Sequence, residues 1–352
     1  MKILFLEERE YYKNLGLKIS DEITVEYNGI KYYKKNDALK RYDYIISFMY
    51  LNPMCNYIIT KANELGIETI LVSDGIVDWT YLFNWKFAKK KKLVTFHPII
   101  HDYFFVLGKF ELGYFQFKGD KAFQYLPKRI IKEEKIKLPK EIIFLITTAN
   151  TSYFDLDEKK VLINLMNQTI DVLEELNIKF KFRIFDKELI KHLKNYESYE
   201  NVIECNFLES ISDITHVITT PSSISLESMF NERKVCHFFY RDDPVFLRSA
   251  WNLIPGLDIK KSLKDFYYGN KEKNIYQKYI LSTYLESNEI IEKLPKTTLN
   301  SQMKNKSIES ILDSPLNFNF ENFIRKIYLK LKLRKIKNQI VKKIIIKSKN
   351  KD

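Results

Sequence analysis

The fold is decided by the stretch Ile218-Thr219-Thr220-Pro221-Ser222-Ser223-Ile224-Ser225-Leu226-Glu227-Ser228-Met229. An apolar strand leads into a hydroxyl-rich turn, and a helix is expected to begin near Ser223 because Ser and Thr favour helix N-termini. A helix N-terminus offers free backbone N–H groups and the positive end of its dipole to an anion. The turn has no glycine, which excludes a Walker loop or a GxGxxG turn. An anion-binding turn and an ordinary capped helix both remain open at this point.

The following residues extend this stretch into a β-turn-α-β unit. Asn231-Glu232-Arg233 reads as a short polar turn, and residues 234–239 read as another apolar strand. In open parallel sheets, ligands bind at the carboxyl ends of the strands, and the hydroxyl-rich turn is expected to lie at such an end. The first candidate binding residues are therefore Thr219, Thr220, Pro221, Ser222 and Ser223.

Strands and helices alternate along the rest of the chain. We expect strands at residues 2–6, 42–48, 68–72, 103–107, 141–146, 179–185, 201–204 and 213–218, and long helices at residues 53–65 and 158–176. Strand-helix-strand units with short joints form right-handed parallel sheets. The predicted fold class is therefore α/β, with two Rossmann-like domains that face a cleft. Their predicted bounds are 1–130 and 141–317, with a charged linker at 131–140 and a basic tail at 318–352.

Composition narrows the class of protein. The 352 residues are 45% hydrophobic and 29% charged, which fits a globular chain with a substantial core. Cys55, Cys205 and Cys236 are far apart and the five His are scattered. We therefore expect a reducing cytosol as the compartment, and no disulfide framework, metal site or cofactor. The N-terminus does not read as a signal peptide, and no apolar run approaches the ~20 residues of a spanning helix.

Most of the net charge of +13 lies in the tail. The last 32 residues hold 12 Lys or Arg and 2 acidic residues, so they carry +10 and leave +3 for the body. Apolar residues recur among them at helical spacing, which favours a basic amphipathic helix on an anionic membrane surface. A bundle helix and a nucleic-acid arm are the alternatives, and the near-neutral body argues against a nucleic-acid partner. We expect a cytoplasmic protein, peripheral at the inner face of the cytoplasmic membrane.

Three groups of residues carry a resemblance to a known family. The first group is Asp74-Gly75. The second is the run Ile146-Thr147-Thr148-Ala149-Asn150, with Phe182-Arg183-Ile184-Phe185-Asp186 after the next long helix. The third is the hydroxyl-rich turn, with Lys234-Val235 and Tyr240-Arg241-Asp242-Asp243-Pro244 after it. Together they resemble bacterial surface-polysaccharide glycosyltransferases of the two-domain architecture called GT-B. Within these, the pattern is similar to the sialyltransferases and 3-deoxy-octulosonate (Kdo) transferases of capsule and lipooligosaccharide synthesis. The hydroxyl-rich turn is the most specific part of the resemblance.

The resemblance implies roles for individual residues. Ser and Thr residues of the hydroxyl-rich turn would hold the donor phosphate, and Asp74 would be the general base. Asp78 is the rival base four residues on, and His97 is a further catalytic candidate. The other candidate residues for binding the donor are Thr147, Thr148, Asn150, Arg183 and Glu227.

The residue types leave alternatives open for several of these candidates. Asp74 can simply cap the helix that follows it. Arg183 can clamp a phosphate as a fork or pair with Glu188. Glu227 can accept ribose hydroxyls or pair with Arg233.

The function implied by the resemblance is inverting transfer of a sugar from a nucleotide-sugar donor to a surface glycan or lipid-linked acceptor. No Asp-x-Asp stands at a strand end, so no obligatory metal is expected. The family favours a CMP-linked acidic sugar, but the one His-Pro of this chain, His97-Pro98, lies in the first half, so UDP-, GDP- or dTDP-sugars remain possible. A CDP-alditol phosphotransferase and a nucleotide-sugar 2-epimerase are alternative enzymes. A non-enzymatic nucleic-acid binder is the alternative from a different class.

Overall fold

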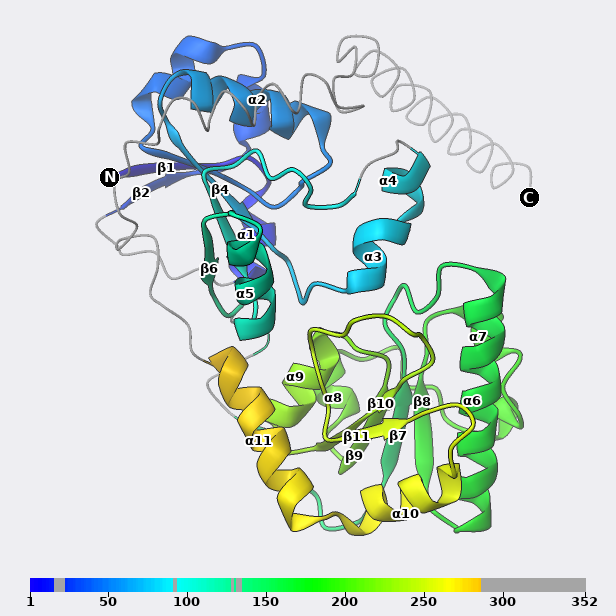
Figure 1. The fold of residues 1–352 in the computed structure, drawn as a ribbon. Coiled ribbons are helices and arrows are strands. Elements are labelled where there is room, and N and C mark those ends of the chain that lie inside the picture. The colour runs from blue at the N-terminus through cyan, green and yellow to red at the C-terminus, as the bar shows by residue number, and fades with distance from the viewer. Residues whose placement is uncertain (16–22, 91–93, 128–129, 131–134, 286–352) are drawn as a thin grey trace, which may run out of the picture.

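The computed structural model describes residues 1–15, 23–90, 94–127, 130 and 135–285. Its strands form two parallel sheets, one in each half of the chain (Figure 1). This confirms the predicted α/β class with two Rossmann-like domains. The predicted tail at 318–352 lies outside the described residues, and so does part of the predicted linker at 131–140.

The first sheet has six strands in the order β2-β1-β3-β4-β5-β6. The strands are β1 (Lys2–Phe5), β2 (Thr24–Glu26), β3 (Tyr44–Ser47), β4 (Glu68–Val72), β5 (Tyr103–Val106) and β6 (Ala122–Gln124). The helices of this domain are α1 (Arg9–Leu15), α2 (Pro53–Glu64), α3 (Trp79–Asn84), α4 (Lys86–Lys90) and α5 (Lys109–Phe117). Because all six strands run parallel, the turns that follow them lie at one edge of the sheet.

The second sheet has five strands in the order β11-β10-β9-β7-β8. The strands are β7 (Phe144–Thr147), β8 (Phe180–Arg183), β9 (His216–Thr219), β10 (Lys234–Phe238) and β11 (Trp251–Leu253). The helices are α6 (Leu156–Glu175), α7 (Lys187–Ile190), α8 (Phe207–Ser210), α9 (Ser223–Phe230) and α10 (Ile259–Tyr268). β7 lies between β9 and β8, so the two predicted donor turns, which follow β7 and β9, are neighbours.

The longest helix among the described residues, α6, shows how the sequence pattern forms the core of the second domain. Its buried residues recur every three or four positions, which makes one apolar face on a 20-residue helix: Leu162, Leu165, Met166, Ile170 and Leu173. This face packs in one cluster with Phe144 and Ile146 of β7. Truncating one of the buried leucines to Ala is expected to cost about 2–5 kcal/mol. The rigid sheet beneath the donor turns depends on this packing.

The helix α11 (Lys271–Leu285) connects the two domains after the second sheet is complete (Figure 1). Its Gln277 side chain bonds the backbone of the second domain, accepting from Val235 N at 2.8 Å. One and a half turns later, Thr283 O accepts from Gln124 Nε2 of the first domain at 2.7 Å. Tyr284 contacts Glu111 of α5 at 3.4 Å between oxygens. The helix therefore fixes the position of one domain against the other, which the sequence pattern did not predict.

Arg233 fixes the start of the second domain to its sheet. The residue is fully buried, and each of its N–H groups bonds a backbone carbonyl, those of Ile136, Lys137, Ile211, Ile214 and Asn231. These bonds leave the guanidinium no free donor for the predicted pairing with Glu227. Arg233 is therefore a structural residue that holds segment 136–137 in place.

Several predicted elements differ from the structure in informative ways. The predicted strand at 201–204 is wrong, because only Asn201 forms a single bridge to Phe182. Asn201 instead clamps Ile184 with its side chain, accepting from the N–H at 2.9 Å and donating to the O at 3.1 Å.

No described helix is long and apolar enough to cross a membrane.

Candidate functional site

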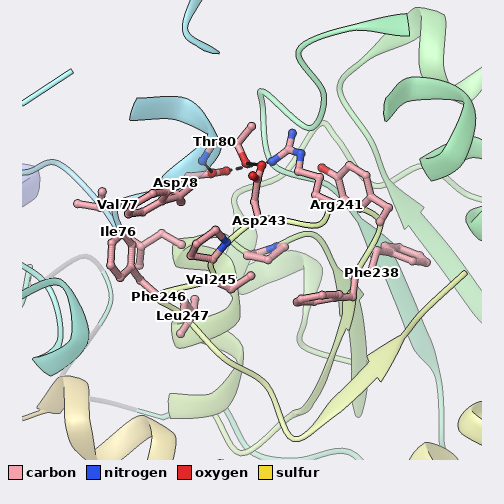
Figure 2. A pocket seen from close by; sticks show the side chains of 15 residues that line it. Ile76, Val77, Asp78, Thr80, Phe238, Arg241, Asp243, Val245, Phe246 and Leu247 are labelled. Atoms are coloured by element: carbon pink, nitrogen blue, oxygen red, sulfur yellow. Dashed lines mark hydrogen bonds and ion pairs between the residues drawn. The ribbon is translucent and has the colours of Figure 1, made fainter. Parts of the chain in front are cut away.

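The carboxyl ends of the two sheets meet across the boundary between the domains. The turn after β4, residues 73–78, contacts the start of α9, where Ile76 N donates to Ser223 Oγ at 3.4 Å. A pocket opens beside this contact, and Figure 2 shows the side chains that line it. Its walls come from residues 76–80 of the first domain and from Pro221, 238–241 and 243–247 of the second. Of the predicted site residues, Asp78 and Pro221 line this pocket, whereas Asp74, Ser222 and Ser223 do not.

Asp78 has two structural tasks at this boundary. One carboxylate oxygen caps α3 by accepting from Thr80 N at 2.8 Å and from Tyr81 N at 3.3 Å. The other oxygen pairs with Arg241 Nη1 of the second domain at 3.3 Å (Figure 2). A carboxylate bonded in this way is poorly placed to accept a proton from a substrate.

Arg241 is the centre of the contact between the domains, and the sequence pattern did not single it out as a site residue. Besides Asp78, it bonds Glu158 at 3.2 Å and the carbonyl oxygen of Ser152 at 2.8 Å. Thr80 adds a second bond across the boundary by donating to Asp243 Oδ2 at 2.6 Å. The guanidinium is 13% exposed, so its charge is largely removed from water and balanced by two carboxylates. In the sequence, this loop was indicated only because the run from Tyr240 to Pro244 is part of the family resemblance.

Asp74 lies two residues before the contact of Ile76 with α9, and its side chain is exposed. The turn around it is held from below, because Ser73 Oγ donates to Gly75 O at 2.6 Å and Tyr125 OH donates to Ser73 O. Burial, and then the charge of Asp74, raise the pKa of Tyr81 to about 12. The structure therefore gives Asp74 a rigid backbone and an accessible carboxylate.

His97 lies outside the residues that line the pocket. Its Nδ1 is 2.8 Å from Thr95 O, and its Nε2 is 3.0 Å from Tyr114 OH. Burial lowers the pKa of His97, which is half-buried among aromatic rings. Tyr114 in turn packs against Trp79 of the pocket, with ring centroids 5.5 Å apart. His97 is therefore linked to the pocket through Tyr114 and Trp79.

The threonines of the two donor turns mostly bond the protein itself. Thr147 Oγ1 donates to Arg183 O at 2.7 Å, and Thr219 Oγ1 donates to Thr220 O at 3.0 Å. Thr220 Oγ1 accepts from Ala149 N at 2.8 Å, which ties the turn after β9 to the turn after β7. Thr148 is buried and Asn150 is exposed beside it. These hydroxyls therefore set the shape of the site.

Ser222 is the hydroxyl of the turn that remains uncommitted. It occupies the N-cap position of α9, yet its side chain makes no capping bond. Its Oγ is buried and has no hydrogen-bond partner among the described residues. In the part of the chain that the structure describes, Ser223 Oγ accepts one long bond, from Ile76 N, and Pro221 lines the pocket. The N-terminus of α9 thus combines a buried hydroxyl that has no partner among the described residues with the positive end of a helix dipole.

Arg183 and Glu227 lie on the other side of the donor turns. Arg183 ends β8 and is 8% exposed, and its Nη2 reaches Cys205 O at 3.4 Å. Burial lowers the pKa of Arg183, an effect partly offset by Cys205 and Glu227. Glu188 pairs with Lys191 at 3.1 Å. Glu227 is half-buried on α9, one turn after Ser223.

Comparison with solved structures places the chain among two-domain folds of the GT-B type. A protein assigned as UDP-N-acetylglucosamine 2-epimerase from Listeria monocytogenes matches with a TM-score of 0.53 at 10% identity, over 80% of this chain and 91% of that one. The UDP-GlcNAc 2-epimerase of Methanocaldococcus jannaschii gives 0.46 at 12%, over 80% and 99%. The wall teichoic acid polymerase TagF gives 0.44 at 15%, over 89% of each chain. No protein-family model and no curated protein matches the sequence. At these identities the likeness concerns the fold alone.

The described residues contain no group of three or more His, Cys, Asp or Glu side chains arranged to hold a metal ion. The polar groups near the domain boundary are the N-terminus of α9, the Ser222 hydroxyl without a partner among the described residues, the exposed Asp74 and the largely buried Arg241. Such a set can bind an anionic ligand and remove a proton beside it.

Proposed function

We propose that this chain is an inverting, metal-independent glycosyltransferase that moves a sugar from a nucleotide-sugar donor to a glycan or lipid-linked acceptor. One observation carries the proposal. The bond from Ile76 N to Ser223 Oγ brings the turn that holds Asp74 against the N-terminus of α9. In this proposal, Asp74 and the turn before α9 act together from different domains, as sugar transfer from a phosphate leaving group requires.

The donor phosphates in this proposal lie over the start of α9. Ser222 Oγ, which lacks a protein partner, donates to a phosphate oxygen, together with free N–H groups of the first helical turn. The neighbouring turn at 147–150, tied to this one through Thr220, closes the other side of the phosphates. These donors stabilise the charge that develops on the leaving nucleotide and do the work that a metal ion does in other transferases. The resemblance favours a CMP-linked acidic sugar, and UDP-, GDP- and dTDP-sugars remain candidates.

Asp74 is the general base of the proposed reaction. An acceptor hydroxyl attacks the anomeric carbon while its proton moves to the Asp74 carboxylate. The bond from that carbon to the phosphate oxygen breaks, and the phosphate keeps the electron pair. Attack from the opposite face inverts the configuration. Asp78 is less suited because it caps α3 and pairs with Arg241, and His97 reaches the site only through Tyr114.

The basic tail extends the proposal to the membrane. Its charge of +10 and its apolar spacing suit an anionic lipid surface, which would bring the enzyme to a lipid-linked acceptor. We accordingly place the protein at the inner face of the cytoplasmic membrane, with donor, acceptor and lipid surface as its partners.

A thermal-shift screen with CMP, CDP, UDP, GDP and dTDP tests the proposal. A ligand that binds only the folded protein raises the melting temperature, so stabilisation by one of these names the donor class. The matching nucleotide sugar separates the candidate enzymes. A glycosyltransferase releases nucleotide on adding an acceptor, a 2-epimerase changes the sugar without one, and a CDP-alditol phosphotransferase releases CMP from a CDP-alditol. No stabilisation by any of the five would contradict all three.

A further inference from the structure

Three buried or partly buried arginines of the second domain differ sharply in how well their donors are satisfied. Arg233 gives all of its N–H groups to carbonyl oxygens. Arg241 bonds two carboxylates and a carbonyl. Arg183 is 8% exposed, yet within the described part of the chain its one hydrogen bond is a long one, of 3.4 Å, to Cys205 O. Buried arginines are normally paired, so the exception requires an explanation.

The donors of Arg183 that remain free point to a ligand. Its Nε is buried without a hydrogen-bond partner, and no carboxylate of the described residues pairs with the guanidinium within 4.0 Å. The residue stands at the carboxyl end of β8, the edge where ligands bind in parallel sheets. The structure thus holds a desolvated cation beside the donor turns, where a bound molecule can complete its hydrogen bonds.

The surroundings of Arg183 are flat and aromatic. The guanidinium lies 4.8 Å from the ring centroid of Phe185 and 5.5 Å from that of Phe207. Phe185 is 47% exposed, so its ring offers an open face. Aromatic rings and guanidinium planes are the surfaces on which nucleobases stack. This arrangement suits a planar group better than a tetrahedral phosphate.

The order of the strands indicates how a ligand would lie along the edge of the sheet. β7 lies between β8 and β9, so Arg183 is two strands, about 10 Å, from the start of α9. Thr147 bonds Arg183 O, and Thr220 bonds Ala149 N, so the three strand ends form one continuous edge. Glu227 lies between, on α9, near enough for its charge to act on Arg183. The negative charge of Glu227 disfavours a phosphate at that place and suits sugar hydroxyls.

We propose that Arg183, Phe185 and Phe207 form the nucleobase subsite of the donor site, and that this subsite takes a base with a carbonyl acceptor. This inference rests on the proposed function, because it requires that the site binds a nucleotide. The phosphates lie at Ser222, the ribose hydroxyls at Glu227, and the base on the exposed part of the Phe185 ring, beside the Arg183 guanidinium. An arginine offers donors only, so it matches the carbonyl oxygens of uracil, cytosine, thymine or guanine. Adenine has an amino group in place of the carbonyl and is disfavoured.

Calorimetry with CMP, UDP, CDP, GDP, dTDP, ADP and inorganic pyrophosphate tests this subsite on the full chain. The wild-type protein should bind one carbonyl-bearing nucleotide at least tenfold more tightly than ADP. Arg183→Met keeps the length of the side chain and removes its donors. This variant should lower the affinity for that nucleotide about 10- to 100-fold and leave the affinity for pyrophosphate unchanged. Phe185→Ala should weaken the nucleotide likewise, whereas Phe117→Ala, at a 93% exposed ring of the first domain, should not.

Thermal denaturation without ligand gives an independent readout. Arg183→Met removes a poorly bonded buried charge and should leave the melting temperature unchanged or raise it. Arg233→Met should lower it strongly, because five carbonyls lose their donors. A large loss of stability in Arg183→Met would show a structural role and overturn the subsite.

The outcomes separate this inference from the proposed function. If a nucleotide binds and Arg183→Met binds it equally well, the subsite is wrong and the function stands. If Arg183→Met weakens pyrophosphate as much as the nucleotide, the guanidinium holds phosphate and the base lies elsewhere. If ADP binds as tightly as the other nucleotides, the base class is wrong. If the wild-type protein binds none of these ligands, the proposed function and the subsite fail together.

Discussion

Asp78 of the first domain and Arg241 of the second form an ion pair of 3.3 Å across the domain boundary. The same guanidinium also bonds Glu158 at 3.2 Å, while Asp78 caps α3. The pair therefore joins the start of α3 to the start of α6. It fixes the width of the pocket, which both residues line.

Arg241→Met should loosen this joint. The change leaves Asp78 and Glu158 partly buried without their cation, at 28% and 18% exposure. We expect a loss of about 1–3 kcal/mol in the free energy of unfolding, together with a larger radius of gyration by X-ray scattering. Lys191→Met, at an exposed ion pair within the second domain, is the control. Equal stability of the two variants would show that the pair does not hold the domains.

Ser222→Ala should separate binding from stability. The hydroxyl makes no bond within the described residues, so its removal should change the free energy of unfolding by less than about 0.5 kcal/mol. Nucleotide affinity should fall, since a hydrogen bond to a charged phosphate contributes about 1.5–3 kcal/mol. Thr220→Val is the contrasting variant, because it loses the bond from Ala149 N and should cost about 1 kcal/mol of stability. Unchanged nucleotide affinity in Ser222→Ala would exclude phosphate binding at this hydroxyl.

Glu111 predicts a pH dependence of stability. Its side chain is fully buried on α5, against Tyr284 of α11, and burial raises its pKa from 4.5 to about 8. The folded state therefore holds the proton that the unfolded state loses. The stability from this group is fully present below about pH 4.5 and is lost as pH rises to about 8. Glu111→Gln should raise the melting temperature more at pH 8 than at pH 5, and an equal change at both values would contradict the raised pKa.

A chain cut after Pro315 tests the role assigned to the tail. It should fold, bind nucleotide and act on a soluble acceptor, because the described domains end before it. It should no longer sediment with anionic vesicles, since about 1 kcal/mol of attraction per basic residue is lost with the tail. Salt should release the full-length protein in part, because screening weakens only the charge component. Undiminished sedimentation of the shortened chain would move the membrane contact to the body.

The central strands could be predicted from the sequence, whereas three edge strands could not. β4 and β10 are runs of buried apolar residues, which identify them directly. β2, β6 and β11 lie at sheet edges and have three residues each, too few for a periodic pattern to show. The strand expected at 201–204 failed because its apolar residues follow Asn201, whose side chain replaces strand pairing with bonds to Ile184.

The polar turn before α9 could be predicted from the sequence, but the individual bonds of its side chains could not. Ser and Thr after an apolar strand indicate a polar turn at a helix start, and the structure places one there. The sequence cannot distinguish Ser222, which is free, from Thr220, which braces the neighbouring turn. It likewise cannot distinguish Arg183 from Arg233, because the difference lies in carbonyl groups brought together by folding. The contact of Arg241 with Asp78 joins residues 163 positions apart and has no local signal.

Turnover of Asp74→Asn and Asp78→Asn is the most direct test of the central claim. The substrate is the nucleotide sugar whose nucleotide stabilises the protein, and the readout is nucleotide release. Asn keeps the shape of Asp74 but cannot accept a proton, so the rate should fall about 10²–10⁴-fold with donor affinity unchanged. Asp78→Asn should retain most of the rate per folded molecule and lose stability, because it weakens a cap and an ion pair. A near wild-type rate in Asp74→Asn, with a collapse in Asp78→Asn, would contradict the account.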